Sequence, residues 1–251
     1  MSSLVDKLYN IFREVIFDRI SKVKGKICVP ISGGLDSRLI AGFLQDSIDL
    51  VLIFGNPGAK HIEYAHRIAQ TVGYKKGIIV TTVTDDELEE NKEIVKKING
   101  LEESTKSYCH LKHANEIVDL SQYTFVVPHM LDPYMGGNVN LLTLWRQKKT
   151  KEYWFHYEKE ISNKGALIYK HFGGYINPIM DDRLKEFNDK LPLKYKFHQY
   201  LYRQMFKKYF PELAAIPRDN MNVRMDCNEV TYFIARLIRY IKKKIGKYEF
   251  Y

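Results

Sequence analysis

Short apolar runs alternate with helix-like patterns through the first half of the chain. Four such runs predict strands at residues 27–31, 50–54, 78–82 and 123–127. Between them, apolar residues recur every three or four positions, as in helices that bury one face. Strands alternating with helices are typical of a parallel sheet covered on both faces, so the pattern predicts an α/β fold.

Polar residues mark where several of these helices begin and end. Ser3 followed by Asp6 predicts a capping box, and helical spacing then continues to Ile20. Thr84 followed by Glu87 predicts a second capping box, directly after the third strand. These signals place helices before the first strand and between the third and fourth.

After Gly137 the sequence predicts helices and no further strand. The breaks between these helices fall at Gly173-Gly174, Pro192, Pro211 and Pro217. The last helix begins near Asn228; its apolar face consists of Phe233, Leu237, Ile241 and Ile245 and lies opposite a basic one. We therefore expect an α/β domain at residues 1–140 and a C-terminal helical lobe at 141–251, packed as one unit.

Amino-acid composition indicates the kind of partner and the cellular location to expect. The 251 residues are 45% hydrophobic and carry a formal net charge of +9, which indicates an anionic partner such as a nucleotide or nucleic acid, or simply a solvated basic surface. No apolar run is long enough for a membrane span and the first residues are charged, so we expect a cytoplasmic protein that does not bind membranes. Cys28, Cys109 and Cys227 form no Cys-x-x-Cys pair, which argues against a disulfide framework or a closed zinc site.

The strongest chemical signal is the stretch Val29-Pro-Ile-Ser-Gly-Gly-Leu-Asp-Ser-Arg38 between the first strand and the next helix. Such a loop presents unpaired backbone N–H groups and the positive end of the helix dipole at one point. Gly33 and Gly34 allow the main chain to approach phosphate, while Ser32 and Ser37 add hydroxyl groups. Asp36 is a candidate ligand for Mg²⁺. The loop therefore predicts binding of ATP through its phosphates.

The hexapeptide Ser-Gly-Gly-x-Asp-Ser at residues 32–37 resembles the fingerprint of the PP-loop ATP pyrophosphatases. Three further stretches are similar to the synthetase domain of the asparagine synthase family: residues 127–137, 178–192 and 209–217. Together the similar stretches span roughly residues 25 to 220. The resemblance implies an adenine nucleotide alpha hydrolase-like fold and an amide-forming ligase that cleaves ATP to AMP and pyrophosphate.

Site residues follow from this resemblance, position by position. Asp132 matches the family aspartate that shares magnesium with the loop aspartate, here Asp36, and His129 falls on a glutamate that transfers protons. The nucleotide would contact the loop and the ends of the first two strands. The positions implied for it are Ile31, Ser32, Gly33, Gly34, Leu35, Asp36, Ser37, Phe54, Gly55 and Gly136.

The chain departs from the family pattern at several positions. Pro133 stands where the family has a second glutamate, Asn220 where it has a lysine, and His61 where it has an acidic residue. The candidates to replace the lysine are Arg218, Arg224, Arg146 and His129. Residue 2 is serine and no glutaminase domain precedes the loop, so glutamine hydrolysis is not expected. Nitrogen would come from ammonia, a substrate amine or another subunit, and aspartate is a doubtful acceptor.

Other interpretations remain open at this stage. The shared loop and the basic charge also fit a tRNA-modifying enzyme, and the altered positions fit a nucleotide-binding protein without activity. Cys109, His110 and His113 have a spacing that fits a metal site or a polar helix start. The basic face of the last helix fits RNA, acidic lipid or water. The acceptor and the oligomeric state are not determined.

Overall fold

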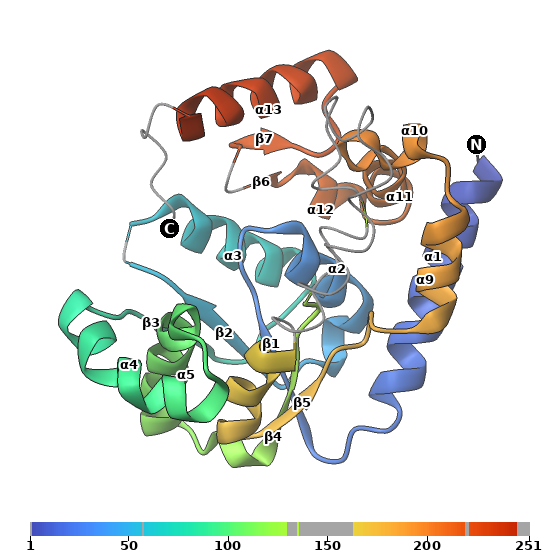
Figure 1. The fold of residues 1–251 in the computed structure, drawn as a ribbon. Helices are drawn as coiled ribbons and strands as arrows, with labels where there is room; N and C mark the ends of the chain where they lie inside the picture. The colour runs from blue at the N-terminus through green and yellow to red at the C-terminus, as the bar shows by residue number, and fades with distance from the viewer. Residues whose placement is uncertain (1, 57, 130–134, 136–162, 219–220, 245–251) are drawn as a thin grey trace.

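A five-stranded parallel sheet forms the centre of the molecule (Figure 1). The computed structural model describes residues 2–56, 58–129, 135, 163–218 and 221–244. The strand order is β3-β2-β1-β4-β5. The strands are β1 (Lys26–Pro30), β2 (Leu50–Phe54), β3 (Ile78–Thr81), β4 (Tyr123–Val126) and β5 (Gly174–Ile176). The four strands predicted from apolar runs are confirmed, with ends that agree within one residue.

Alternating residues of the strands belong to two hydrophobic cores, one on each face of the sheet. In β1, Ile27 and Val29 belong to one core and Cys28 to the other. Strand β2 divides in the same way, with Val51 on the first face and Leu52 on the second. Because every second side chain of a strand points to the same face, an apolar run without polar interruptions requires cover on both sides.

Helices supply that cover. The first face carries α1 (Ser2–Ile20), α2 (Leu35–Leu44) and α3 (Lys60–Thr71), together with α9 (Asp182–Lys190), α10 (Leu193–Lys196), α11 (Tyr200–Tyr209) and α12 (Pro211–Ala215). The second face carries α4 (Asp85–Asn99), α5 (Thr105–Ile117) and a helix over residues 163–172. Short 3₁₀ turns η1 (Gln45–Ser47), η2 (Glu102–Ser104), η3 (Leu120–Gln122) and η4 (Phe197–Gln199) complete the connections. One core therefore joins helices from both ends of the chain.

Strand β5 corrects the expectation that no strand follows Gly137. It pairs in parallel with β4, with Gly174 opposite Thr124. A Cβ atom on Gly174 would lie 2.6 Å from the Thr124 hydroxyl, and one on Gly173 would lie 2.5 Å from the Leu120 carbonyl oxygen. Glycine thus permits the close approach, and the three-residue strand has no apolar run to reveal it. The boundary expected at residue 140 lies outside the described residues.

Of the two predicted capping boxes, one is confirmed and one is wrong. The Thr84 hydroxyl accepts a bond from the Glu87 N–H (3.3 Å), and the Glu87 carboxylate accepts one from the Thr84 N–H (2.8 Å). By contrast, α1 begins at Ser2, so Ser3 lies inside the helix. Asp6 instead accepts a hydrogen bond from the Tyr209 hydroxyl (2.5 Å) on α11. Asp6 therefore makes a tertiary contact with α11, whereas the local sequence pattern assigned it to a helix cap.

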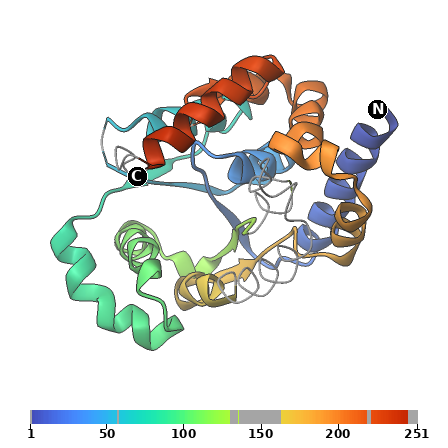
Figure 2. The same ribbon diagram turned by 45° about the horizontal axis from the view of Figure 1, so that its top comes forward.

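The C-terminal part ends in a small hairpin and a long helix. Strands β6 (Pro217–Arg218) and β7 (Val223–Arg224) pair antiparallel, and α13 (Glu229–Lys244) follows them. Figure 2 shows α13 at the periphery, on the side of the molecule away from α4 and the helix over 163–172. Within the described ranges, no helix combines the length and the apolar content that crossing a membrane requires.

Candidate functional site

The predicted phosphate loop lies at the point where the strand order reverses. From β1 the chain builds β2 and β3 on one side and then returns to place β4 and β5 on the other. Open α/β sheets bind ligands beyond the carboxyl ends of the strands at such a switch point. The loop that starts at Ile31 follows β1, and His129 follows β4. These two predicted elements therefore lie on adjacent strands at the binding edge of the sheet.

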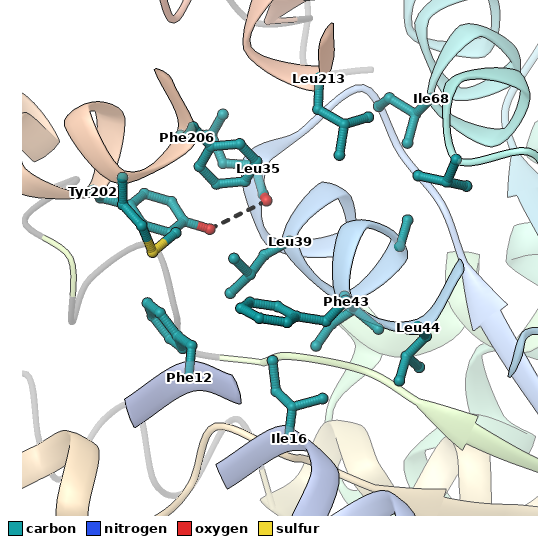
Figure 3. Close-up of a cluster of buried hydrophobic side chains, with 14 of the residues drawn as sticks. Phe12, Ile16, Leu35, Leu39, Phe43, Leu44, Ile68, Tyr202, Phe206 and Leu213 are labelled. Atoms are coloured by element: carbon teal, nitrogen blue, oxygen red, sulfur yellow. Dashed lines mark hydrogen bonds between the residues drawn. The ribbon is translucent and has the colours of Figure 1, made fainter. Parts of the chain in front are cut away.

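Helix α2 holds the loop against the core. Its N-cap is Gly34, which has no side chain to cap the first-turn N–H groups, so they remain suited to an anion. Leu39 and Phe43 pack into the cluster of Figure 3, where the Tyr202 hydroxyl donates to the Leu35 carbonyl oxygen (3.3 Å). The Leu35 side chain is itself buried, so this predicted site residue is restricted to main-chain contact with a ligand.

Two serine hydroxyls shape the loop from within. The Ser32 N–H donates to Ser37 Oγ (3.0 Å), the two hydroxyl oxygens lie 3.2 Å apart, and the Gly34 N–H donates to Ser32 Oγ (3.2 Å). Ser37 is buried, whereas Ser32 is exposed and Asp36 is half-buried in the first helical turn. The sequence predicted the same role for both serines, but their environments differ. Ser37 stabilises the loop through hydrogen bonds, whereas the Ser32 hydroxyl is exposed to solvent.

Arg38 is a structural anchor that the sequence did not reveal. Its guanidinium is fully buried and donates to the Gly33 carbonyl oxygen at 2.9 Å. The same group donates to the carbonyl oxygens of Leu213 (3.0 Å), Ile216 (2.7 Å) and Pro217 (3.0 Å). Arginine suits this position because its planar fork carries five donors. One side chain thus ties the loop to the segment that joins α12 to β6.

The strand ends predicted to receive adenine lie side by side. Ile31 extends the pairing of β1 with β2, its N–H donating to the Leu52 carbonyl oxygen (2.8 Å). Gly55 follows β2 with φ of +154°, and a Cβ atom there would fall 2.0 Å from His61 Nε2. His61 Nε2 also lies 3.1 Å from the Phe54 carbonyl oxygen. Only glycine leaves room for the imidazole, so the His61 ring packs closely against this turn.

A buried histidine supports the same edge. His110 on α5 stacks on Phe54, with ring centroids 4.8 Å apart, and its Nδ1 lies 2.9 Å from the Thr81 hydroxyl. Burial lowers the pKa of His110 to about 4, and positive charge on Lys106 adds to the effect. The imidazole is therefore neutral near pH 7. Sequence reasoning considered this residue only as a metal ligand or part of a helix start.

The three candidate metal ligands on α5 diverge. Cys109 Sγ approaches the Glu87 carbonyl oxygen (3.6 Å), and His113 lies 2.7 Å from the Glu87 carboxylate through Nε2. His113 Nδ1 is 2.8 Å from the Thr82 carbonyl oxygen, and His110 bonds to Thr81. Among the residues that the structure describes, no group of three His, Cys, Asp or Glu side chains is arranged to hold a metal ion. The metal-site interpretation of this helix gains no support.

His129 occupies the far side of the switch point. Its Nδ1 lies 3.0 Å from the Tyr175 hydroxyl of β5, and its carbonyl oxygen accepts a bond from the Asn177 side chain (2.9 Å). Burial lowers the pKa of His129 to about 4, which leaves the ring neutral near pH 7. Because the sequence pattern missed β5, it offered no signal for Tyr175 as a partner.

Two of the arginines that were candidates to replace the family lysine are engaged elsewhere. Arg218 is buried and donates to the side chain of Gln199 (2.6 Å) and to the Tyr232 hydroxyl (3.1 Å). The Arg224 Nε donates to the Asp226 carboxylate (2.8 Å). The remaining predictions concern Asp132, Pro133, Gly136, Arg146 and Asn220, all of which lie outside the described residues.

The three cysteines lie in environments that favour the thiol over the thiolate. Burial raises the pKa of Cys28 well above its ordinary value, and Cys28 is fully enclosed in β1. Burial also raises the pKa of Cys109 and of Cys227. A cysteine that transfers sulfur reacts as the thiolate, so these environments weigh against a tRNA-modifying enzyme that would use one of these cysteines to transfer sulfur.

Comparison with known proteins leaves the family open. No family model matches the chain, and a search of curated proteins finds no significant match. The likeness to the asparagine synthase family thus rests only on the residues quoted above.

Proposed function

We propose that the chain binds ATP with Mg²⁺ at the loop Ser32–Ser37 and transfers the AMP group to an oxygen of a small-molecule substrate. The observation that carries this proposal is the position of the loop. It leaves the central strand β1 at the switch point of the sheet and enters a buried helix whose N-cap, Gly34, has no side chain. The N-terminus of a helix at such a switch point suits a pyrophosphate, because the N–H groups of the first helical turn and the helix dipole favour an anion there.

The proposed chemistry is mainly electrostatic. A substrate carboxylate attacks the α-phosphorus, the bond to the β-phosphate oxygen breaks, and pyrophosphate leaves with the developing negative charge. In the proposed complex, loop N–H groups and the Ser32 hydroxyl would donate to the oxygens on which that charge develops. Asp36 would hold Mg²⁺ together with phosphate oxygens, a coordination that needs few protein ligands, and the ion would neutralise phosphate charge.

His129 supplies a base for the second half of the proposed reaction. An amine or ammonia would displace AMP from the activated carboxylate and must lose a proton as it does so. Burial lowers the pKa of His129 to about 4, which leaves the ring neutral at pH 7 and able to accept that proton, but makes it a weak base. Contact with Tyr175 at 3.0 Å orients the ring. The amine could be a substrate amine or ammonia supplied by a separate subunit.

Exchange between ATP and labelled pyrophosphate tests the adenylation step. With Mg²⁺ and a panel of carboxylic acids, at least one acid should support exchange in the wild-type chain. Asp36→Asn should weaken Mg²⁺-dependent ATP binding by an order of magnitude or more, because it removes the proposed ligand charge. Asp46→Asn is the matched control, since Asp46 is an exposed aspartate in η1 beyond the other end of α2.

The two assays separate the parts of the proposal. Mg²⁺-dependent ATP binding without exchange for any acid would overturn adenylation and leave a nucleotide-binding protein. Equal binding by wild type and Asp36→Asn would remove Asp36 from the site. Loss of binding in Asp46→Asn as well would assign the effect to folding, which thermal unfolding of both variants would reveal.

A further inference from the structure

Helix α13 carries its apolar residues on the outside of the molecule. The exposed fractions are Val230 68%, Phe233 40%, Ile234 48%, Leu237 46%, Ile238 48%, Tyr240 53% and Ile241 48%. We call these seven residues the α13 face. An isolated exposed apolar side chain is normal, but a continuous row along one helix marks an interaction surface.

The opposite side of α13 is attached to the body of the protein. Tyr232 is fully buried, and the Arg203 guanidinium lies 3.6 Å from the centre of its ring. Arg203 also pairs with Glu229 at 2.8 Å, and Arg218 donates to the Tyr232 hydroxyl (3.1 Å). At about 100° per residue, Tyr232 points away from Leu237 and Ile241. The attachment therefore holds the α13 face outward.

The positive charge of α13 favours an anionic partner for the α13 face. Besides Glu229, which pairs with Arg203, α13 contains no acidic residue. Its basic residues are Arg236, Arg239, Lys242, Lys243 and Lys244. Two copies of the chain, each with a formal net charge of +9, repel one another, which disfavours self-association. An anionic partner gains from the same charges.

We propose that the α13 face docks on an anionic lipid surface, with the helix lying in the plane of the headgroups, which departs from the expectation that a chain without a spanning segment does not bind membranes. Roughly 160° of the helix circumference is apolar, which is wider than the two-position seam of a helix–helix contact and typical of helices that lie in an interface. Lys242 is exposed beside this arc, where it can reach phosphate groups of the lipid. The proposal is independent of ATP chemistry.

Sedimentation with vesicles tests the docking. The full chain is mixed with vesicles of phosphatidylcholine alone, or of phosphatidylcholine and phosphatidylglycerol, at low and high salt. Binding is expected to the mixed vesicles, with a bound fraction that falls as salt rises, and little binding to phosphatidylcholine alone. The double variant Leu237→Glu, Ile241→Glu should lose at least tenfold in affinity. Ile117→Glu is the matched control, because Ile117 is 65% exposed at the end of α5.

A charge variant tests the electrostatic part separately. Lys242→Glu should weaken binding to the mixed vesicles by about fivefold or more, since each basic residue near such a surface contributes about 1 kcal/mol. Lys112→Glu, an exposed lysine on α5, should leave binding unchanged. Circular dichroism confirms that each variant is folded; if the double variant unfolds, the Lys242 pair and the salt series still decide the question.

Several outcomes would overturn the proposal. These are no binding to the mixed vesicles, binding that the α13 variants leave unchanged, or equal binding to both vesicle types at all salt concentrations. Light scattering that shows a dimer dissociated by Leu237→Glu would identify a second copy as the partner instead. Retention of RNA that is lost in Lys242→Glu, without vesicle binding, would identify a nucleic acid.

Discussion

Helices α2 and α13 carry similar apolar residues but use them in opposite ways. All but one of the ten residues of α2 are buried, and Arg38 and Leu39 are fully enclosed. Helix α13 buries Tyr232 on one side and exposes seven apolar or aromatic side chains on the other. Helix α2 is packed on all sides beside the predicted phosphate loop. Helix α13 packs against the protein along one side only, at the periphery of the molecule (Figure 1).

This difference separates two uses of hydrophobic surface. Burial of α2 fixes the position of a short loop, which a phosphate site needs because its N–H groups must be oriented before the ligand arrives. Exposure of α13 leaves surface available for a partner. Substitutions in the two helices should therefore differ strongly in their effect on stability.

The largest effect is expected from Arg38→Ala. The change leaves the carbonyl oxygens of Gly33, Leu213, Ile216 and Pro217 without their buried donor. We expect the free energy of unfolding to fall by about 4 kcal/mol, measured by urea denaturation. Arg67→Ala, an exposed arginine on α3, should stay within about 0.5 kcal/mol. Equal effects of the two changes would contradict the anchoring role of Arg38.

Leu39→Ala should have the next largest effect. Leu39 is fully buried between α2 and its neighbours, so truncation removes apolar contact and leaves a cavity. A loss of about 3 kcal/mol in the free energy of unfolding is expected from equilibrium denaturation. A loss below about 1 kcal/mol would mean that the core around α2 is loosely packed.

Acid should loosen α13 before α2. Burial of His198 within η4, together with positive charge on Arg236 and Arg203, lowers the pKa of this residue from 6.5 to about 4. Between these values the unfolded chain binds a proton that the folded chain does not, so stability falls as pH falls from about 6.5 to 4. We expect this residue to contribute about 2 kcal/mol to that loss. Hydrogen exchange should rise in α13 more than in α2.

His198→Asn provides the comparison for the acid effect. His198 has φ of +52°, and asparagine tolerates that conformation while removing the titrating group. The variant should show a shallower fall in the urea midpoint from pH 7 to pH 4.5. If both chains lose stability equally over this range, protonation of His198 is not the cause.

Leu237→Ala should have the smallest effect. Because Leu237 is 46% exposed on α13, little apolar surface returns to water when it is truncated. The free energy of unfolding should change by less than about 0.5 kcal/mol, against about 3 kcal/mol for the same substitution at Leu39. A loss comparable with that of Leu39→Ala would show that the α13 face is buried in solution.

Local patterns predicted much of the fold. Four strands, the helices between them and the Thr84 cap were read correctly, because each depends on residues within one turn or one strand. The loop at residues 32–37 was also placed correctly between a strand and a helix, whereas phosphate binding by this loop stays a prediction. These features required no knowledge of the rest of the chain.

Contacts between distant residues decided the remainder. Strand β5 exists because Gly174 fits against Thr124, fifty positions earlier, and this pairing brings Tyr175 to His129. Arg38 finds three of its four acceptors 175 to 179 residues away. In both cases the hydrogen-bond partner can be identified only in the folded chain, because a contact between residues far apart in the sequence leaves no repeating pattern in the sequence.

The sequence by itself determined the α/β class, the place of the loop at residues 32–37 and the amphipathic character of the last helix. Periodicity states which residues of a helix share a face, but it does not state what that face meets. Only the tertiary structure decided that α2 is enclosed on all sides and that the α13 face is turned outward, because burial depends on how distant elements pack. The same packing brought Arg38 and Tyr175 to the site.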